Sequence, residues 1–197
     1  MATTTGAADT DKAAFAARLK EFEGKEAGDP EQGADPVNQP MIRHWVEAVG
    51  DENPIYTQRE AAEESVHGEI VAPPVMLQAW VMRGVRPRPT GGGNARDELM
   101  TLLDGAGFTS VVATNCEQEY HRYLRHGEQV TVRSRLESVT GPKRTALGEG
   151  WFVTTRSTWY AGDEAVAAMR FRVLKYRGVA LRLPGGLPPG RRSAPPG

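Results

Sequence analysis

The sequence predicts an α+β domain in which an antiparallel sheet curls around one buried helix. Residues 75–82 (VMLQAWVM) are apolar nearly all round, which is typical of a helix buried on most faces. From Val111 onward the apolar period changes to two, and it is clearest over residues 130–138 and 167–173. Short turns such as AGDE at residues 161–164 join these runs, as in an antiparallel meander.

Two amphipathic helices are expected before the buried one. Phe15, Leu19 and Phe22 are spaced as on one helix face, and Gly24 is a stop signal. Residues 38–50 (NQPMIRHWVEAVG) predict a helix with an asparagine cap, a proline in its first turn and a terminal glycine. A short polar helix should follow the Asn-Pro turn at residues 53–54.

Loops and tails divide the chain into a partly helical segment (1–20), one domain (21–177) and a tail (178–197). Residues 85–98 (VRPRPTGGGNARDE) are broken by prolines and glycines, and we expect a long exposed loop there. GPKRTALG at 141–148 is expected to turn the chain between two strands. The tail is too rich in proline and glycine to pack, so it is expected to be a disordered end or a linker to a further domain.

Composition excludes several classes of function. The net charge is −1, with 25% charged residues of both signs, so neither nucleic acid nor an anionic membrane is expected as a partner. There is no apolar run of ~18 residues and no signal peptide, which favours a cytoplasmic protein. The single cysteine, Cys116, cannot form an internal disulfide or a metal cluster alone, and we expect a small buried side chain there.

Four motifs appear in an order that is typical of one family. They are VGDENPIYTQREAA (49–62), GEIVAPPVM (68–76), EQEYHRYLRHGEQVTVRSRLESV (117–139) and RFRVLKYR (170–177). Over roughly residues 21–177 the chain resembles the MaoC-like (R)-specific enoyl-CoA hydratases and dehydratases. The resemblance implies a single hotdog fold. The combination of GDxNPI with IVAPP is the most specific part of it.

The resemblance also implies that the catalytic groups of the family are lost. Active members use an aspartate and a histidine five positions later for proton transfer. A histidine-glycine pair at the start of the buried helix donates a backbone N–H to the enolate oxygen. Here Asp51 matches the aspartate, Tyr56 falls on the histidine, and Pro73 and Pro74 fall on the histidine-glycine pair. The pKa of a phenol is ~10, which is too high for proton transfer near neutral pH, and proline has no N–H to donate. No catalytic residue is therefore expected in this chain.

The degenerate half-domain type occurs in heteromeric actinobacterial hydratases, steroid side-chain hydratases among them. By this resemblance the chain is a non-catalytic subunit that shapes the acyl pocket for a bulky 2-enoyl-CoA. A MaoC-like partner with an intact dyad would do the chemistry, and a thiolase-like aldolase would bind through a further C-terminal domain. The CoA thioester is the substrate, with no cofactor and no metal. The expected pocket residues are Asn53, Tyr56, Pro74, Met76 and Trp80.

Other interpretations stay open at this point. Asp51 can simply organise the turn before the Asn-Pro pair. A self-sufficient homo-oligomeric hydratase would use Asp51 with Tyr56 or with His67, which otherwise is a loop histidine. A hotdog acyl-CoA thioesterase would need a carboxylate near the central helix, and Glu69 is the nearest candidate.

The remaining histidines and two arginines have surface positions in this interpretation. His44 falls on a polar helix face, and His121 and His126 flank a strand end. Arg122 and Arg125 can meet a CoA phosphate, but we expect them to lie on a solvated strand instead.

Overall fold

The computed structural model describes residues 4–82, 84 and 93–178. The helices are α1 (Thr4–Lys20), α2 (Gln39–Val49), α3 (Arg59–Glu63) and α4 (Ala95–Gly105). Short 3-10 turns are η1 (Pro54–Tyr56), η2 (Pro74–Met76) and η3 (Ala79–Val81). The strands are β1 (Glu31–Gln32), β2 (Val71–Ala72), β3 (Ser110–Tyr120), β4 (Leu124–Arg125), β5 (Val130–Thr145), β6 (Gly148–Ala161) and β7 (Glu164–Tyr176). The expected tail beyond residue 178 lies outside the described residues.

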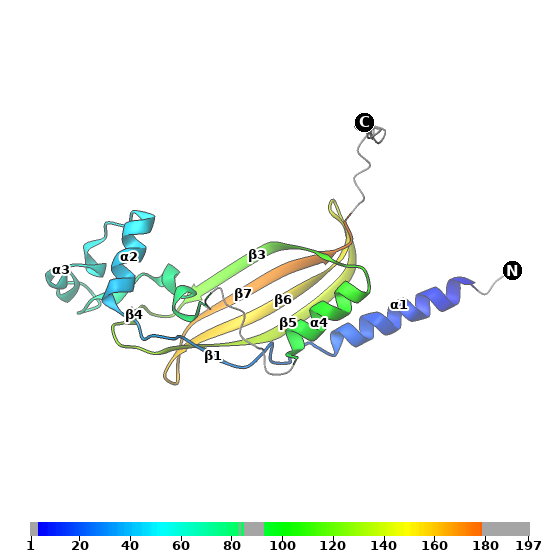
Figure 1. Ribbon diagram of the computed structural model, residues 1–197, viewed down its shortest axis with the longest axis horizontal. Coiled ribbons are helices and arrows are strands. Elements are labelled where there is room, and N and C mark those ends of the chain that lie inside the picture. The colour runs from blue at the N-terminus through cyan, green and yellow to red at the C-terminus, as the bar shows by residue number, and fades with distance from the viewer. Residues whose placement is uncertain (1–3, 83, 85–92, 179–197) are drawn as a thin grey trace, which may run out of the picture.

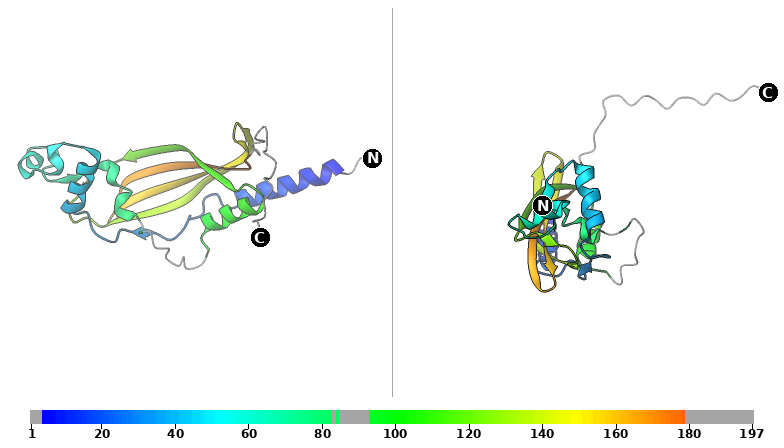
Figure 2. Two further views of the ribbon diagram at one scale, coloured as in Figure 1. Left: turned by 45° about the horizontal axis from the view of Figure 1, so that its top comes forward. Right: turned by 90° about the vertical axis from the view of Figure 1, so that its left-hand side faces the viewer.

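A long antiparallel sheet organises the chain and confirms the α+β prediction. Its strand order is β1-β5-β6-β7-β3, and β2 and β4 form a separate two-stranded ribbon. Figure 1 shows α2 and α3 at one end of the sheet and α1 with α4 at the other, beside β5. The left view of Figure 2 shows the same separation from a second direction. Strand β3 therefore forms the edge opposite to the helices α1 and α4.

Two hydrophobic cores occupy the two ends of one side of the sheet, which we call the inner face. The α2 core consists of Val37, Ile42, Val46, Tyr56, Val71, Ala72, Met76, Leu77, Trp80, Leu124, Val130, Val132, Trp159, Val166 and Ala167. The α4 core consists of Leu19, Phe22, Ala27, Leu99, Leu103, Phe108, Leu136, Val139, Trp151, Val153 and Val173. Each core is completed by side chains from helices that pack on its own end.

Two cross-strand rows of the inner face lie where these cores adjoin, and Leu136 of the α4 core ends one of them. One row runs Gln118, Met169, Ser157, Ser134 from β3 to β5, and the next runs Cys116, Phe171, Thr155, Leu136. Burial falls across each row: the β5 and β6 ends are buried or half-buried, whereas the β3 residues are exposed. We call the β3 and β7 members of the two rows (Cys116, Gln118, Met169 and Phe171) the open strip.

The segment predicted as the central helix, residues 75–82, forms the turns η2 and η3 instead. Val75 and Met82 are 61% and 72% exposed, whereas Met76 and Trp80 are buried. Two prolines precede this segment, and its eight residues give only about two turns, which is too short for a stable helix without capping. Gly33 also approaches this segment closely, because a Cβ built there would collide with the carbonyl oxygen of Trp80.

Part of the predicted loop 85–98 is a helix. Residues 85–92 lie outside the described residues, but α4 begins at Ala95, directly after its N-cap Asn94, whose side chain accepts from the Asp97 N–H at 2.9 Å. The buried amine of Lys175 on β7 donates to Asp104 Oδ1 at 2.5 Å and ties α4 to the sheet. The Asn94 cap and the leucines of LMTLL (residues 99–103) were the sequence signals for this helix. The glycines before them favoured a loop instead.

The strands also depart from strict alternation. Leu136 and Val139 are both buried on the inner face, because one extra residue, Glu137, sits in a bulge opposite β6. Strand β5 then continues past Gly141-Pro142, and the turn is shorter and later than predicted, at residues 146–147. Cys116, expected to be buried, is exposed because edge strand β3 has no helix over it among the described residues.

Other local predictions are confirmed. Asn38 caps α2 by accepting from the Met41 N–H at 3.0 Å, and Gly50 ends it with a φ of 72°. Residues 167–173 of β7 alternate as expected, and residues 161–164 turn the chain between β6 and β7. Within the described ranges, every helix is too short or too polar to cross a bilayer.

Candidate functional site

Asp51 acts as a turn organiser at the end of α2. Its Oδ1 accepts a hydrogen bond from the Asn53 N–H at 3.1 Å, and Asn53 Oδ1 in turn accepts from the Ile55 N–H at 3.3 Å. Both side chains are exposed. These bonds form the consecutive Asx turns that start η1, so the turn role left open above is the one that the geometry displays.

Tyr56 is buried in the α2 core and is only 6% exposed. Burial, and after it the neighbouring Tyr123 phenol and the Asp51 charge, together raise the pKa of its phenol to about 12. Tyr56 is therefore neutral near pH 7, where it can donate a hydrogen bond but cannot accept a proton as a general base. The sequence placed Asp51 and Tyr56 together, and the structure keeps them within electrostatic reach.

Pro73 and Pro74 lie where the resemblance places the family's oxyanion donor. Pro73 is buried and Pro74 half-buried, and their carbonyl oxygens accept the Met76 and Leu77 N–H groups at 3.0 and 3.1 Å. Since proline has no N–H, neither residue can donate to an oxyanion. Of the expected pocket residues, Tyr56, Met76 and Trp80 share the α2 core, and Asn53 lies outside it.

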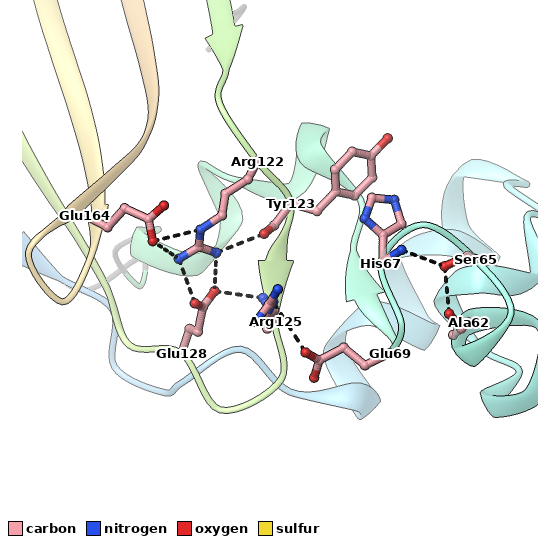
Figure 3. Close-up of polar contacts among 9 residues, drawn as sticks. All are labelled: Ala62, Ser65, His67, Glu69, Arg122, Tyr123, Arg125, Glu128 and Glu164. Atoms are coloured by element: carbon pink, nitrogen blue, oxygen red, sulfur yellow. Dashed lines mark hydrogen bonds and ion pairs between the residues drawn. The ribbon is translucent and has the colours of Figure 1, made fainter.

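His67 packs against the ring of Tyr123. The two rings stack with centroids 4.4 Å apart and planes tilted by 41°. The His67 N–H donates to Ser65 Oγ at 3.1 Å, and that hydroxyl donates to the Ala62 carbonyl oxygen, which fixes the loop after α3. Figure 3 shows the histidine packed on the tyrosine ring beside this loop.

The guanidinium of Arg122 forms structural ion pairs, so it is neither solvated nor available to bind a phosphate. It donates to both carboxylate oxygens of Glu128 at 2.8 and 2.9 Å, to Glu164 at 2.8 and 3.0 Å, and to the Tyr123 carbonyl oxygen (Figure 3). These bonds raise the pKa of Arg122 and lower that of Glu164. The planar guanidinium thus ties the β3–β4 turn to the hairpin of β6 and β7.

A cavity of about 390 Å³ lies among α2, α3 and the β2–β4 ribbon. It is lined by Gln39, Arg59, Glu63, Glu69, Ile70 and His126. Both acids are paired: Glu69 lies 3.3 Å from Arg125, and Glu63 lies 3.9 Å from Arg59. The carboxylate that a thioesterase would need is therefore engaged with an arginine. His44 and His121 are exposed, as expected.

The family follows from a comparison with known proteins. The family model described as "FAS1-like, dehydratase domain region" matches residues 23–169. The chain belongs to this family. Every site residue described above lies inside the matched range of the FAS1-like region, from Gln39 to Glu164.

Similar proteins add detail to this membership. The FAS1-like chain is 49% identical over 172 residues to the "3-oxo-4,17-pregnadiene-20-carboxyl-CoA hydratase alpha subunit" of Mycobacterium tuberculosis, covering 84% of this chain and 54% of the relative. It thus spans about half the length of that relative. A chain of the solved ChsH1-ChsH2 complex of M. tuberculosis is similar at a TM-score of 0.76 and 48% identity, with 86% of this chain and 93% of that chain covered.

A more distant solved structure bears on the fold alone. The MaoC-like dehydratase of Rhodospirillum rubrum matches at a TM-score of 0.50 and 19% identity, covering 77% of this chain and 92% of that one. Together with the antiparallel sheet, these neighbours confirm the hotdog prediction. In the FAS1-like chain, the segment 75–82 forms the turns η2 and η3.

The sequence analysis did not single out three residues that make interactions in or near the candidate site. Tyr123 shares the environment of the Tyr56 phenol, although it is 67 positions away in the numbering. Gln78 and Gln118 both reach the sulfur of Met169 from different elements. Only the alternating pattern of β3 could have placed Gln118 on the inner face, and no local signal placed the other two.

Proposed function

We propose that this chain is the non-catalytic MaoC-like subunit of a heteromeric enoyl-CoA hydratase that acts on a bulky 2-enoyl-CoA. The observation that carries the proposal is the pair Pro73–Pro74, which offers no N–H where the family's oxyanion donor falls. Loss of one such donor typically costs on the order of 10²–10³ in rate. The neutral phenol of Tyr56 adds a second, independent loss.

The magnitude of the second loss follows from the raised pKa. With a pKa of about 12, only about one Tyr56 side chain in 10⁵ is a phenolate at pH 7. A general base with so small an active fraction contributes little to the activation of water. The two departures affect different groups needed for the same hydration, the base for water and the donor for the enolate oxygen.

The catalytic partner in this proposal is a second MaoC-like hotdog subunit with an intact aspartate and histidine. Strand β3 supports this, because among the described residues it pairs with β7 on one side only, and it is exposed from Val111 to Glu119. A long unpaired edge is a template for a strand of another chain. Val111 and Val112, 58% and 36% exposed, would be covered there. The expected complex joins the two sheets edge to edge.

The bulky acyl group is supported by the open strip. Residues 75–82 do not form a helix. Cys116 and Gln118 are exposed, and Met169 and Phe171 are only half-buried. A half-buried apolar surface flanked by polar groups suits a large apolar acyl chain. The similar alpha subunit is named for a 3-oxo-pregnadiene carboxyl-CoA, and we propose a substrate of that class here.

A thiolase-like aldolase is proposed as a second partner, recruited by a further domain. This part of the proposal depends on the family resemblance, and no contact of the described residues argues for it. It is tested separately, by co-purification of the aldolase with the hydratase complex.

The central experiment compares this chain alone, a MaoC-like partner alone, and the two co-expressed. Turnover of crotonyl-CoA and of a polycyclic 2-enoyl-CoA is followed by loss of enoyl-thioester absorbance. We expect negligible hydration by this chain and full activity only in the complex. Hydration by the isolated chain at a rate near that of the complex would instead favour a self-sufficient homo-oligomeric enzyme.

A further inference from the structure

Two glutamine amides converge on one weak acceptor at the open strip. Gln118 Nε2 lies 3.4 Å from Met169 Sδ, and Gln78 Nε2 lies 3.5 Å from the same sulfur. Both glutamine side chains are exposed. A thioether sulfur is a poor hydrogen-bond acceptor, so both amides keep donor capacity for a better one. An oxygen atom placed above the sulfur would be within reach of both.

The amide of Gln118 is held in a fixed orientation. The Tyr120 hydroxyl donates to Gln118 Oε1, which turns the Nε2 group of the amide toward Met169. Burial, and then the charge of Cys116, raise the pKa of the Tyr120 phenol, so this hydroxyl keeps its proton near neutral pH. The donor side of Gln118 is thus directed over the strip.

Gln78 reaches the strip from a different element. It lies between η2 and η3, in the segment that replaces the expected central helix, and it contacts β7 across 91 positions of the chain. Gln118 stands directly opposite Met169 in the register of β3 and β7. The two donors therefore approach the same point from the turn segment and from the sheet edge.

The surroundings of this point distinguish it from the rest of the inner face. Met169 packs against the α2 core, and Phe171 packs against the α4 core, so the floor is apolar. The next polar side chains along the row, Ser134 and Ser157, are hydrogen-bonded to each other at 2.8 Å and are already satisfied. An apolar floor with a few convergent donors is the usual composition of a small-molecule site.

We propose that Gln78 and Gln118 form a donor pair that binds a ketone oxygen on the ring system of a polycyclic acyl-CoA lying over the open strip. The inference rests on the proposed function and adds a determinant of specificity to it. The amides do not take part in the hydration. They position the acyl group through an oxygen far from the thioester, so their effect falls on KM.

The test uses the assembled complex and two matched thioesters. One is a polycyclic 2-enoyl-CoA with a ring ketone, and the other carries CH₂ in place of that carbonyl. Gln118→Leu and Gln78→Leu should each lower kcat/KM for the ketone substrate about 2- to 12-fold, the range for one neutral hydrogen bond. The loss should appear in KM, with kcat unchanged. The double variant should no longer prefer the ketone.

The controls separate this inference from the proposed function. Gln58→Leu changes an exposed glutamine before α3 that makes no capping bond, and it should leave both substrates unaffected. All variants should melt and co-elute with the partner as wild type does. If the complex hydrates both substrates and the variants lose both equally, or lose neither, the donor pair is refuted while the hydratase function stands. If the complex hydrates neither these thioesters nor crotonyl-CoA, both proposals fail.

Discussion

The buried phenol of Tyr56 should remain protonated well into the alkaline range, and this can be measured directly. Its pKa is raised to about 12 by burial and by Tyr123 and Asp51. At pH 10.5 a phenol with that pKa is about 3% ionised, whereas one at the ordinary value of ~10 is about three-quarters ionised. In ¹³Cζ-tyrosine NMR, the signal that disappears in Tyr56→Phe should hardly move between pH 7 and 10.5.

The same shift predicts a change in stability with a definite sign. The folded state holds the phenol proton more tightly than the unfolded state, so the contribution is complete below pH ~10 and is lost as pH rises toward the folded value. Between pH 9 and 11 the free energy of unfolding should fall by about 1.3 kcal/mol through Tyr56 alone. The gap between wild type and Tyr56→Phe, from urea unfolding, should narrow by that amount.

Two outcomes would refute this reasoning. A Tyr56 signal that titrates at or below pH 10 would mean that the phenol is solvated, and a chemical role for it would have to be considered again. Parallel pH profiles for wild type and Tyr56→Phe would lead to the same conclusion. Tyr160→Phe, at a half-buried position on β6, is the matched control and should leave the Tyr56 signal in place.

Three further substitutions test individual contacts. Asp51→Ala should lower stability by about 0.5–2 kcal/mol, as loss of a capping side chain does, and leave turnover of the complex within a few-fold. Gly33→Ala should destabilise the chain by about 1–3 kcal/mol in urea unfolding, because the new methyl group would collide with the Trp80 carbonyl oxygen. Glu164→Gln should flatten the fall in melting temperature between pH 4.5 and 3, since Arg122 lowers the pKa of Glu164 and that stability is lost as pH falls through the lowered value.

The controls and contrary outcomes are specific. A loss of turnover beyond about 10²-fold in Asp51→Ala at unchanged stability would give Asp51 a chemical role. Gly28→Ala places its Cβ 3.6 Å from Asn94, an ordinary contact, and should be nearly silent. If Gly33→Ala is equally silent, the close approach is absent in solution. An acid limb unchanged by Glu164→Gln would show that the Arg122 pair contributes no net stability.

Local signals in the sequence predicted the elements that they specify locally. The α2 helix carries its own cap at Asn38 and its own stop at Gly50, and strand alternation is visible wherever no bulge interrupts it. The bulge at Glu137 cannot be read from the sequence, because its position is set by pairing with β6. One extra residue in a strand turns every later side chain to the opposite face of the sheet. The period of two expected over residues 130–138 therefore fails after Leu136.

The sequence named the residues of the candidate site but not their arrangement. The motifs identified Asp51, Tyr56, Pro73 and Pro74, because each motif is contiguous in sequence, and their loss of catalytic function stays a prediction. The prediction of a central helix was wrong. The apolar residues of this segment lie in two short turns, which bury Met76 and Trp80. Contacts across the sheet, such as those of Tyr123, depend on register and could not be derived from local pattern.

The separation of the two cores has a consequence for how the molecule opens. Because each end of the sheet is stabilised by its own helices, and the open strip between them is thinly packed, the two ends need not unfold together. Regions with few buried contacts open at lower free energy than the global transition. The end with α2 and α3 can thus exchange its amide hydrogens in partial openings while the strands under α4 stay protected. Such a weakness at mid-sheet would let one half of the domain rearrange while the other half keeps its packing.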